Sequence, residues 1–195
     1  SFPGVRALHD VSFALNAGEV TALIGENGAG KSTIVKILTG IYTPDEGEIA
    51  VGGITRSFCS PRDCWAAGIA AIHQETVMFE ELSAAENIFI GRQPTRGAGL
   101  FKVIDWARMN AEARRVIEPF GVHLDPARRL RDLRFSERQI TEICKAISLD
   151  AKLLLLDEPT SALTAGEITT LFGIIRRLKA SGVAVVYISH RISEI

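Results

Sequence analysis

The stretch "GENGAGKST", residues 25–33, decides the fold class of this chain. Gly25, Gly30, Lys31 and Ser32 fit the phosphate-loop pattern G-x-x-x-x-G-K-[ST]. Glycines let the backbone curl so that successive N–H groups face inward, and a helix starting at the loop adds positive potential. In such a loop the lysine reaches the β- and γ-phosphates, and the serine hydroxyl can ligate Mg²⁺. The pattern predicts that the phosphates of a nucleotide are held by Gly25, Glu26, Asn27, Gly28, Ala29, Gly30, Lys31, Ser32 and Thr33.

The residues on either side supply the strand and helix that the loop requires. "GEVTALIG" is a short apolar run ending in Gly25, as in a buried strand. A helix is expected from Lys31, because residues 34, 37, 38 and 41 are apolar and share one face. Further short strands are expected at residues 7–15, 69–74, 152–156 and 183–189. Strands that alternate with helices predict a parallel α/β sheet.

Between about residues 75 and 149 the pattern changes to helices and polar loops, which we expect to form an insertion in the sheet domain. Ser83 and Asp105 stand at the starts of two of these helices as N-caps. A third helix is expected to start at Ser136, because Ser136 and Gln139 have capping-box spacing.

Composition places few other limits on the chain. It has 195 residues, 47% of them hydrophobic, and a formal net charge of −1, so no basic field suggests nucleic acid as a partner. No apolar run approaches the roughly 20 residues that span a bilayer, so any link to a membrane is expected to go through a partner protein. Cys59, Cys64 and Cys144 lack metal-ligand spacing and are interpreted as incidental or buried thiols.

A second acidic motif completes the chemistry. Asp157 follows four leucines, at the strand end where a carboxylate lies near the phosphate loop of an open α/β sheet. There Asp157 can hold the Mg²⁺ shell, and Glu158 can polarise an attacking water. Alone this pair would be a weak signal, but the phosphate loop makes it specific.

The motifs together resemble those of the ATP-binding-cassette (ABC) ATPases over essentially all 195 residues. "GENGAGKST" corresponds to the Walker A loop, and "LLLLDEP" to Walker B with its catalytic glutamate, Glu158. "SALT" (161–164) resembles the D-loop, and His190 in "ISHR" resembles the switch histidine that contacts the γ-phosphate. Gln74 in "IHQE" resembles the Q-loop glutamine, which touches Mg²⁺ or the attacking water. Phe2 stands where the family places an aromatic ring on adenine.

The resemblance implies a fold and an activity. The fold would be a RecA-like phosphate-loop NTPase core with a small antiparallel β subdomain and an ABC-specific helical subdomain. Residues 1–74 and 150–195 would form the core, and residues 75–149 the helical subdomain. The chain would hydrolyse ATP with Mg²⁺ as cofactor, with Glu158, His190 and Gln74 as catalytic residues. Ser32, Gln74 and Asp157 would surround the metal.

Several phrases narrow the family further. "ALIGENGAGKST", "LTGIYTPDEGEI", "AENIFIGRQP" and "YISHRISEI" resemble the N-terminal cassette of tandem bacterial monosaccharide importers of the ribose, galactose and xylose type. The resemblance therefore implies a second cassette beyond residue 195. The chain starts at Ser1 without a methionine and is expected to be part of a longer polypeptide. The implied partners are that cassette, a membrane permease docked near Gln74 and residues 75–87, and indirectly a periplasmic sugar-binding protein. The implied location is peripheral, on the cytoplasmic face of the bacterial inner membrane.

"LRFSERQ" (133–139) departs from the family pattern at the signature, which is usually of the LSGGQ type. Arg134 replaces the serine whose hydroxyl would bind a γ-phosphate across a dimer, and Ser136 stands where glycine is common. Two alternatives remain open beside sugar import: a non-transport ABC ATPase acting in DNA repair or translation, and a regulatory module that binds ATP without turnover. The sequence shows no basic patch or coiled-coil insertion for the first, and Glu158 and His190 argue against the second.

Overall fold

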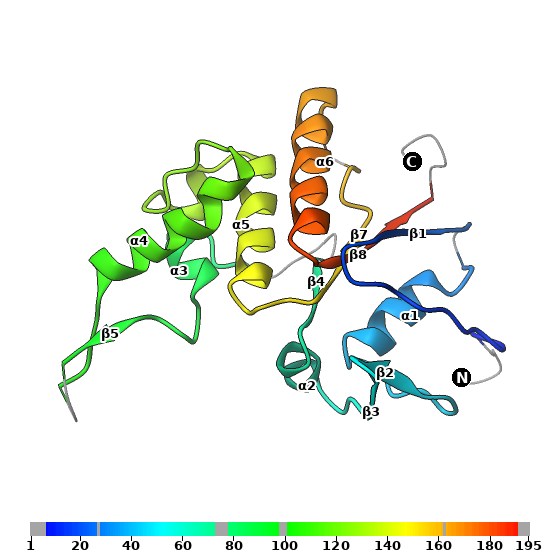
Figure 1. The fold of residues 1–195 in the computed structure, drawn as a ribbon. Coiled ribbons are helices and arrows are strands. Elements are labelled where there is room, and N and C mark those ends of the chain that lie inside the picture. The colour runs from blue at the N-terminus through cyan, green and yellow to red at the C-terminus, as the bar shows by residue number, and fades with distance from the viewer. Residues whose placement is uncertain (1–6, 27, 73–77, 98–100, 162, 191–195) are drawn as a thin grey trace. The chain divides into compact units, whose positions relative to one another are not determined.

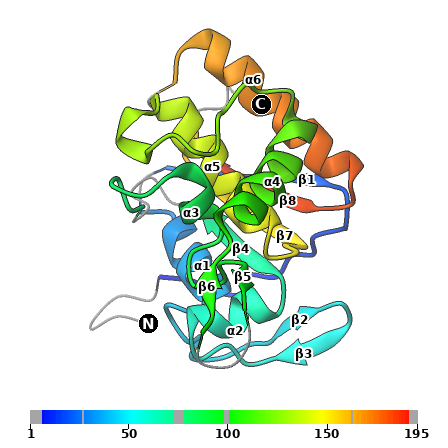
Figure 2. The same cartoon turned by 90° about the vertical axis from the view of Figure 1, so that its left-hand side faces the viewer.

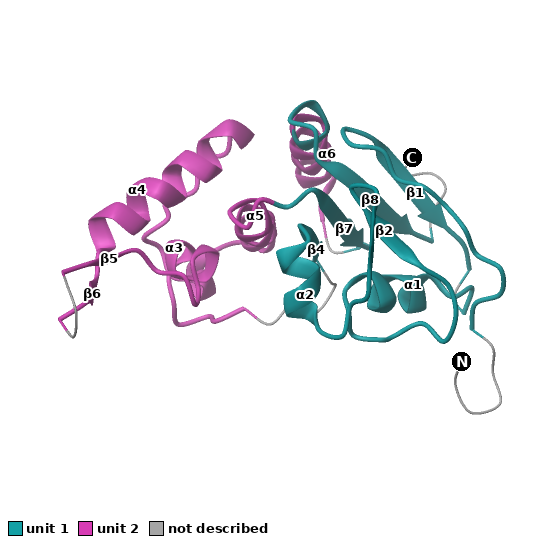
Figure 3. Ribbon diagram, turned by 60° about the horizontal axis from the view of Figure 1, so that its bottom comes forward, with its two compact units in different colours: residues 1–74, 151–161, 178–195 teal, residues 75–150, 162–177 magenta. Residues whose placement is uncertain are grey.

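The computed structural model describes residues 7–26, 28–72, 78–97, 101–161 and 163–190. Contacts along the chain divide it into two compact units, which Figure 3 shows in different colours. Unit 1 comprises Ser1–Gln74, Ala151–Ser161 and Leu178–Ile195, and unit 2 comprises Glu75–Asp150 and Ala162–Arg177. Within the described residues, no helix has both the length and the apolar character needed to cross a bilayer.

Unit 1 is built on a four-stranded sheet in the order β1-β8-β7-β4, in which every neighbouring pair is parallel (Figure 3). The strands are β1 (Val20–Ile24), β8 (Ala184–Ser189), β7 (Leu153–Asp157) and β4 (Ile69–Ile72). All six residues of β8 are buried, which explains why this strand reads as a continuous apolar run. The predicted parallel sheet is confirmed.

One face of this sheet carries a hydrophobic core cluster of unit 1. Leu155, Val186 and Ile188 from the two central strands pack with Val35 of α1 (Lys31–Leu38) and Cys64 of α2 (Pro61–Ala66). Leu155 pairs with Val186 in the sheet register, so both side chains project from the same face. Helix α1, which starts at the phosphate loop, is thereby fixed against the sheet.

Two local features of unit 1 follow ordinary capping and turn chemistry. Ser60 caps α2, accepting a hydrogen bond from the Asp63 N–H, and Pro61 occupies the first helical turn. The short strands β2 (Ile49–Val51) and β3 (Ile54–Arg56) form an antiparallel hairpin. Gly52 and Gly53 join them with φ values of 60° and 77°, as a two-residue hairpin turn requires. This hairpin is the expected small antiparallel element.

The strand expected at residues 7–15 is wrong. The segment is not part of any strand among the described residues, although its polar and apolar residues alternate. Asp10 has a left-handed backbone with φ of 47°, which interrupts the extended conformation that a strand needs.

Unit 2 is mostly helical (Figures 1 and 2). Helices α3, α4 and α5 contact one another pairwise, and Ile88, Met109 and Ile143, one from each helix, are completely or almost completely buried. Ser83 caps α3 and Asp105 caps α4, both as predicted, and Ser83 also forms a reciprocal capping box with Glu86. The elements are α3 (Ala84–Ile88), β5 (Thr95–Arg96), β6 (Val103–Ile104), α4 (Trp106–Ile117), η1 (Glu118–Phe120), η2 (Leu130–Asp132), α5 (Phe135–Ile147) and most of α6 (Ala165–Ala180).

The three cysteines are free thiols, and two of them are buried. Burial raises the pKa of the Cys144 thiol to about 12. Burial, with a smaller contribution from Asp63, raises the pKa of the Cys64 thiol to about 11. Both groups are therefore protonated and unreactive at neutral pH, which agrees with their interpretation as incidental thiols.

Candidate nucleotide-binding site

The parallel sheet of unit 1 brings the predicted site residues to one edge. In the register Ile24 pairs with Ser189, and Asp157 pairs with Ile188, so the carboxyl ends of β1, β7 and β8 coincide. Gly25 follows β1 directly, and His190 follows β8 directly. The phosphate loop, the acidic pair and the histidine thus meet at the edge where open α/β sheets bind their ligands.

Glycine is required at two positions of the phosphate loop. Gly28 and Gly30 have φ values of 89° and 87°, in the left-handed region. A Cβ atom at Gly30 would also lie 2.8 Å from the carbonyl oxygen of Ala7 and 2.8 Å from Leu8 Cδ2. A side chain there would collide with the main chain, so the curled loop depends on this glycine.

The Lys31 ammonium folds back over the loop. Nζ donates to the carbonyl oxygens of Gly25 at 2.6 Å and Glu26 at 2.9 Å. The positive charge is therefore held above the loop, next to the first turn of α1. Gly30 is the N-cap of α1 and has no side chain that could cap the helix. No side chain of the N-cap residue therefore occupies the N–H groups of Lys31, Ser32 and Thr33 in the first turn of α1. Charge and amide groups together make this end of α1 suited to a phosphate.

The residues at this edge fit a magnesium ion. Ser32 lies in the first turn of α1 and Asp157 is the last residue of β7, and both offer the oxygen ligands that Mg²⁺ prefers. Mg²⁺ bound with a nucleotide uses only one or two protein ligands and takes the rest from phosphates and water. A denser cluster of three or more His, Cys, Asp or Glu side chains is absent from the part of the chain that the structure describes. The Ser32 hydroxyl and the Asp157 carboxylate are oxygen ligands of the kind that Mg²⁺ uses beside a nucleotide.

Glu158 and His190 contact each other at the same edge. His190 Nδ1 lies 2.9 Å from Glu158 Oε1, and both side chains are partly exposed to solvent. Glu158 has a left-handed backbone with φ of 47°, and its N–H donates to the Ile188 carbonyl of β8 at 3.0 Å. A non-glycine residue in this conformation is uncommon and is often found at functional sites. The sequence pattern gave no sign of this conformation.

The loop after Glu158 is fastened to the sheet by a buried pair that the sequence analysis did not single out. Thr160 Oγ1 lies 3.2 Å from the Tyr187 hydroxyl of β8, and both residues are buried. Buried hydroxyl groups that pair in this way hold a turn rigidly. The pair therefore supports the position of Glu158, two residues before Thr160.

The signature segment lies in unit 2 and differs from the prediction in one detail. Helix α5 begins at Phe135 with Arg134 as the N-cap, whereas a start at Ser136 was expected. The Arg134 N–H donates to Glu137 Oε2 at 2.8 Å, so Glu137, rather than Gln139, supports the helix start. The expected pair, Ser136 with Gln139, lies two residues after the observed pair, Arg134 with Glu137, because both Glu137 and Gln139 fit a capping pattern.

Ser136 and Arg134 lie near the first turn of α6. The Thr164 N–H chiefly lowers the pKa of the Glu167 carboxyl, and the hydroxyls of Ser136 and Thr164 and the charge of Arg134 lower it further. Glu167, in the first turn of α6, accepts hydrogen bonds from the Thr164 N–H at 2.9 Å and from the Thr164 hydroxyl at 2.8 Å. The additional contribution of the signature residues was not foreseen, because the two segments are about 30 residues apart in the sequence.

Three predicted site residues, Phe2, Asn27 and Gln74, lie outside the described residues. The remaining predicted residues gather in unit 1 at the carboxyl edge of the sheet: Gly25, Glu26, Gly28, Ala29, Gly30, Lys31, Ser32, Thr33, Asp157, Glu158 and His190.

Comparison with known proteins gives consistent matches. The family model described as ABC transporter matches residues 8–161. A ribose import ATP-binding protein of Rhizobium meliloti (strain 1021) is 53% identical over 195 residues, covering 100% of this chain and 38% of the relative. A putative ribose/galactose/methyl galactoside import ATP-binding protein of Agrobacterium fabrum is 49% identical over 193 residues, covering 99% of this chain and 37% of the relative. The chain thus spans less than two fifths of the length of these relatives.

Solved structures agree with these matches. A crystal structure of an ATP-binding cassette of an ABC transporter in its ADP conformation has a TM-score of 0.85 at 26% identity, covering 99% of this chain and 78% of that one. A nucleotide-free cassette of an ABC transporter has a TM-score of 0.84 at 27% identity, covering 99% and 79%. The likeness confirms the predicted fold class, a RecA-like α/β core with a helical subdomain.

Proposed function

Since this chain belongs to the ABC transporter family, we propose that it binds ATP with Mg²⁺ and hydrolyses it to energise import of a monosaccharide through a membrane permease. The observation that carries the proposal is the match of the whole chain to relatives named as ribose or galactose import ATP-binding proteins. The geometry supports it, because the phosphate loop, Asp157, Glu158 and His190 share one edge of the sheet.

In this proposal the phosphate loop and the start of α1 bind the triphosphate. The inward N–H groups of residues 25–33 and the Lys31 ammonium neutralise the β- and γ-phosphates. Ser32 and Asp157, with Gln74, hold Mg²⁺, which when bound neutralises charge that develops on the transferred phosphoryl group. Phe2 stacks on the adenine ring.

Glu158 and His190 arrange the attack on the γ-phosphate. Phosphoryl transfer depends mainly on positioning and charge stabilisation, so a carboxylate that orients and polarises one water is the principal catalytic group. Glu158 takes this role, and His190, 2.9 Å from its carboxylate, contacts the γ-phosphate beside it. Gln74 completes the set by touching the water or the metal.

The proposed partners follow from the same assignment. A second cassette, expected beyond residue 195, supplies the other half of each composite nucleotide site. Permease subunits dock on this chain, and a periplasmic sugar-binding protein delivers the sugar to them. The chain then works at the cytoplasmic face of the bacterial inner membrane as a peripheral subunit.

Deletion of the gene for this protein tests the proposed function. Uptake of radiolabelled ribose, galactose or xylose by the deletion strain is expected to fall to background, and the parent gene is expected to restore it. The same assay identifies the sugar. Unchanged uptake of every monosaccharide tested would reject sugar import and favour a non-transport ABC ATPase.

The permease is expected to dock beside Gln74 and residues 75–87. Phe79, in this segment, keeps half of its side-chain surface exposed, which suits an apolar contact. In a Cys59→Ser background, Phe79→Cys should crosslink to the permease. Trp106→Cys is the matched control, because Trp106 on α4 is equally exposed outside the segment. Efficient crosslinking from position 106 with none from position 79 would rule out this docking surface.

Arg134 is expected to be dispensable for transport. In a head-to-tail pair, the signature of this cassette completes the site of the other cassette, and we propose that this second site need not hydrolyse ATP. Arg134→Ser in the full-length protein should therefore leave ATPase and uptake within about twofold of the parent, as for a surface substitution away from the active chemistry. The matched variant replaces the signature serine of the second cassette. This replacement should stop both ATP hydrolysis and sugar uptake.

Assays of phosphate release and sugar uptake test whether Arg134 takes part in ATP hydrolysis. A guanidinium can bind phosphate through two parallel hydrogen bonds, so an active role for Arg134 is chemically possible. Loss of transport in Arg134→Ala alone would show that Arg134 is an active phosphate ligand and would reject the asymmetric-site proposal.

A further inference from the structure

Two segments of unit 2 that are far apart in the sequence are bound together along their main chains. The N–H of Leu130 donates to the carbonyl of Leu82 at 2.9 Å, and the N–H of Arg131 donates to the carbonyl of Glu80 at 3.1 Å. One segment, residues 78–83, lies shortly after Gln74, and the other, residues 128–134, leads directly into the signature. The two segments therefore form one local structure.

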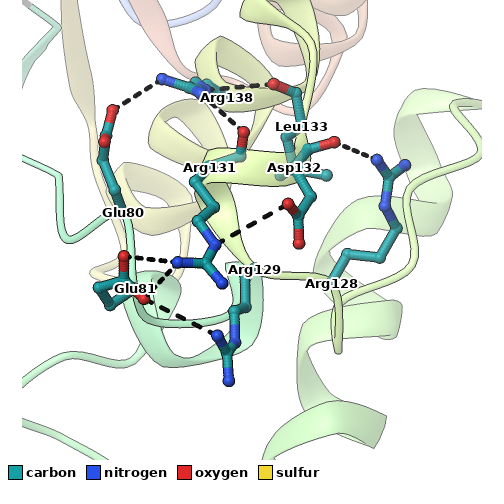
Figure 4. A network of polar contacts seen from close by, with 8 residues as sticks. All are labelled: Glu80, Glu81, Arg128, Arg129, Arg131, Asp132, Leu133 and Arg138. Carbon is teal, nitrogen blue, oxygen red and sulfur yellow. Dashed lines mark hydrogen bonds and ion pairs between the residues drawn. The ribbon is translucent and has the colours of Figure 1, made fainter.

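Arg138, on the first turns of α5, reinforces this structure through its guanidinium group. Nη1 lies 3.0 Å from Glu80 Oε1, Nη2 donates to the Arg131 carbonyl at 3.0 Å, and Nε donates to the Leu133 carbonyl at 3.2 Å (Figure 4). One side chain thus binds the carboxylate of the first segment and two carbonyls of the second. Since Leu133 directly precedes Arg134, the contact fixes the main chain at the signature.

Glu81 makes a second connection beside the first. Arg131 Nη1 lies 2.8 Å from Glu81 Oε1 and 2.9 Å from Oε2, and Arg129 Nη1 lies 3.8 Å from Oε2 (Figure 4). Adjacent carboxylates of the first segment therefore hold two arginines, Glu80 pairing with Arg138 of α5 and Glu81 with Arg131 of the second segment. We call Glu80, Glu81, Arg131 and Arg138 the carboxylate clamp.

The first segment is itself held on α3 by one buried side chain. Asn87 is 2% exposed, and its Oδ1 accepts from the Phe79 N–H at 2.9 Å. Its Nδ2 donates to the carbonyls of Phe79 at 3.0 Å and Ser83 at 2.9 Å. A buried amide satisfied in this way makes the turn rigid, so residues 79–83 move as one piece.

We propose that Glu80 is a positioning residue that, with the rest of the carboxylate clamp, transmits displacement of residues 78–83 to the signature at the start of α5. The inference rests on the proposed function, in which residues 75–87 receive the permease. A shift of the segment then pulls the Arg138 guanidinium and, through it, the Leu133 carbonyl. In this proposal the permease sets the position of the signature main chain through residues 78–83, and closure of the two cassettes on both nucleotides depends on that position. The Arg134 side chain, proposed above to be dispensable, is not needed for this closure.

Charge and exposure make the clamp suited to this role. Glu80 and Glu81 are 63% and 69% exposed in their side chains, and Arg138 is 34% exposed. Exposed ion pairs contribute little to folding stability. If the ion pairs of the clamp are removed, the main-chain hydrogen bonds of Leu130 and Arg131 and the packed core of helices α3, α4 and α5 stay in place. Loss of the clamp should therefore weaken coupling without unfolding the unit.

Glu80→Lys in the full-length protein tests the proposal, because it places a like charge against Arg138. The matched control is Glu112→Lys, which breaks the 2.7 Å ion pair of Glu112 with Arg108 on α4, outside the clamp. Glu80→Gln, which removes the charge without repulsion, is the second variant should Glu80→Lys fail to fold. Two quantities are measured for each protein: hydrogen exchange of a peptide covering residues 128–138, and phosphate release with and without the sugar-loaded binding protein in proteoliposomes containing the permease.

In Glu80→Lys, amides of residues 128–138 should exchange roughly three- to fivefold faster than in the parent, as expected for loss of an exposed ion-pair contact. The ratio of stimulated to basal phosphate release should fall roughly fivefold or more, while ATP affinity stays unchanged. Glu112→Lys should match the parent in both measurements.

Exchange rates in Glu80→Lys equal to those in Glu112→Lys would overturn the clamp as a physical connection. Faster exchange with an unchanged stimulation ratio would overturn its coupling role. If phosphate release by the parent protein does not change when the sugar-loaded binding protein is added, the proposed function is rejected, and the coupling role with it. The exchange result is read separately, so the two failures are distinguishable.

Discussion

Lys31→Ala is expected to abolish measurable binding of Mg-ATP by the phosphate loop of this chain. The ammonium is held over the loop by the carbonyls of Gly25 and Glu26 and is the principal positive side chain at the expected phosphate position. A hydrogen bond to a charged group contributes about 1.5–3 kcal/mol, and Lys31 reaches two phosphates, so the loss should exceed about 3 kcal/mol. That corresponds to at least about a 100-fold increase in Kd. Isothermal titration calorimetry measures the change directly, in full-length protein whose second cassette has its own phosphate-loop lysine replaced.

Lys36→Ala is the matched control for this variant. Lys36 lies on the same helix, but its ammonium is 5.2 Å from the centre of the Tyr42 ring and not over the loop. Its replacement removes the same charge from α1 and should leave the Kd within about threefold, as for a surface substitution. If Lys31→Ala binds nucleotide as tightly as Lys36→Ala, the assignment of Lys31 as a phosphate ligand is incorrect.

Glu158→Gln is expected to keep nucleotide binding and to stop hydrolysis. The amide has the shape of the carboxylate and can still meet His190, but it cannot polarise a water as a base. General-base catalysis contributes about 10²- to 10⁴-fold, so phosphate release should fall by a factor in that range. In the importer, the variant should accumulate in the closed state with ATP bound.

Single-turnover phosphate release, with the Kd from calorimetry as a check, tests this expectation. Glu112→Gln serves as the control, since it makes the same chemical change on α4, in the other unit of the chain. Phosphate release close to the parental rate in Glu158→Gln would transfer the catalytic role to another group, with His190 the next candidate.

Most of the sheet and its site could be predicted from local sequence patterns. Apolar runs that end in glycine or in an acidic residue predicted β1 and β7. The spacing from Gly25 to Ser32 is specific for a phosphate-binding loop. Because carboxyl ends of parallel strands share an edge, the sequence also indicated that Asp157 lies near the phosphate loop that begins at Gly25. His190 was assigned to the site by its resemblance to the switch histidine of ABC ATPases.

What could not be predicted depends on contacts between distant residues and on local backbone conformation. The strand expected at residues 7–15 fails at the left-handed Asp10, and periodicity carries no information about φ. The start of α5 at Phe135 depends on which of two acceptors, Glu137 or Gln139, reaches back to the main chain. The contact of Arg138 with Glu80 joins residues 58 positions apart, which no local pattern encodes.

Phosphate release by the full-length protein, reconstituted with its permease in proteoliposomes, tests the central claim most directly. The claim is that this chain supplies the hydrolytic half of a sugar importer. We predict that adding the binding protein loaded with its monosaccharide raises phosphate release by about fivefold or more, the usual range of coupling between two sites. We further predict that Glu158→Gln in this chain alone removes the increase. A rate that does not respond to the loaded binding protein, or an increase that survives Glu158→Gln, would contradict the account.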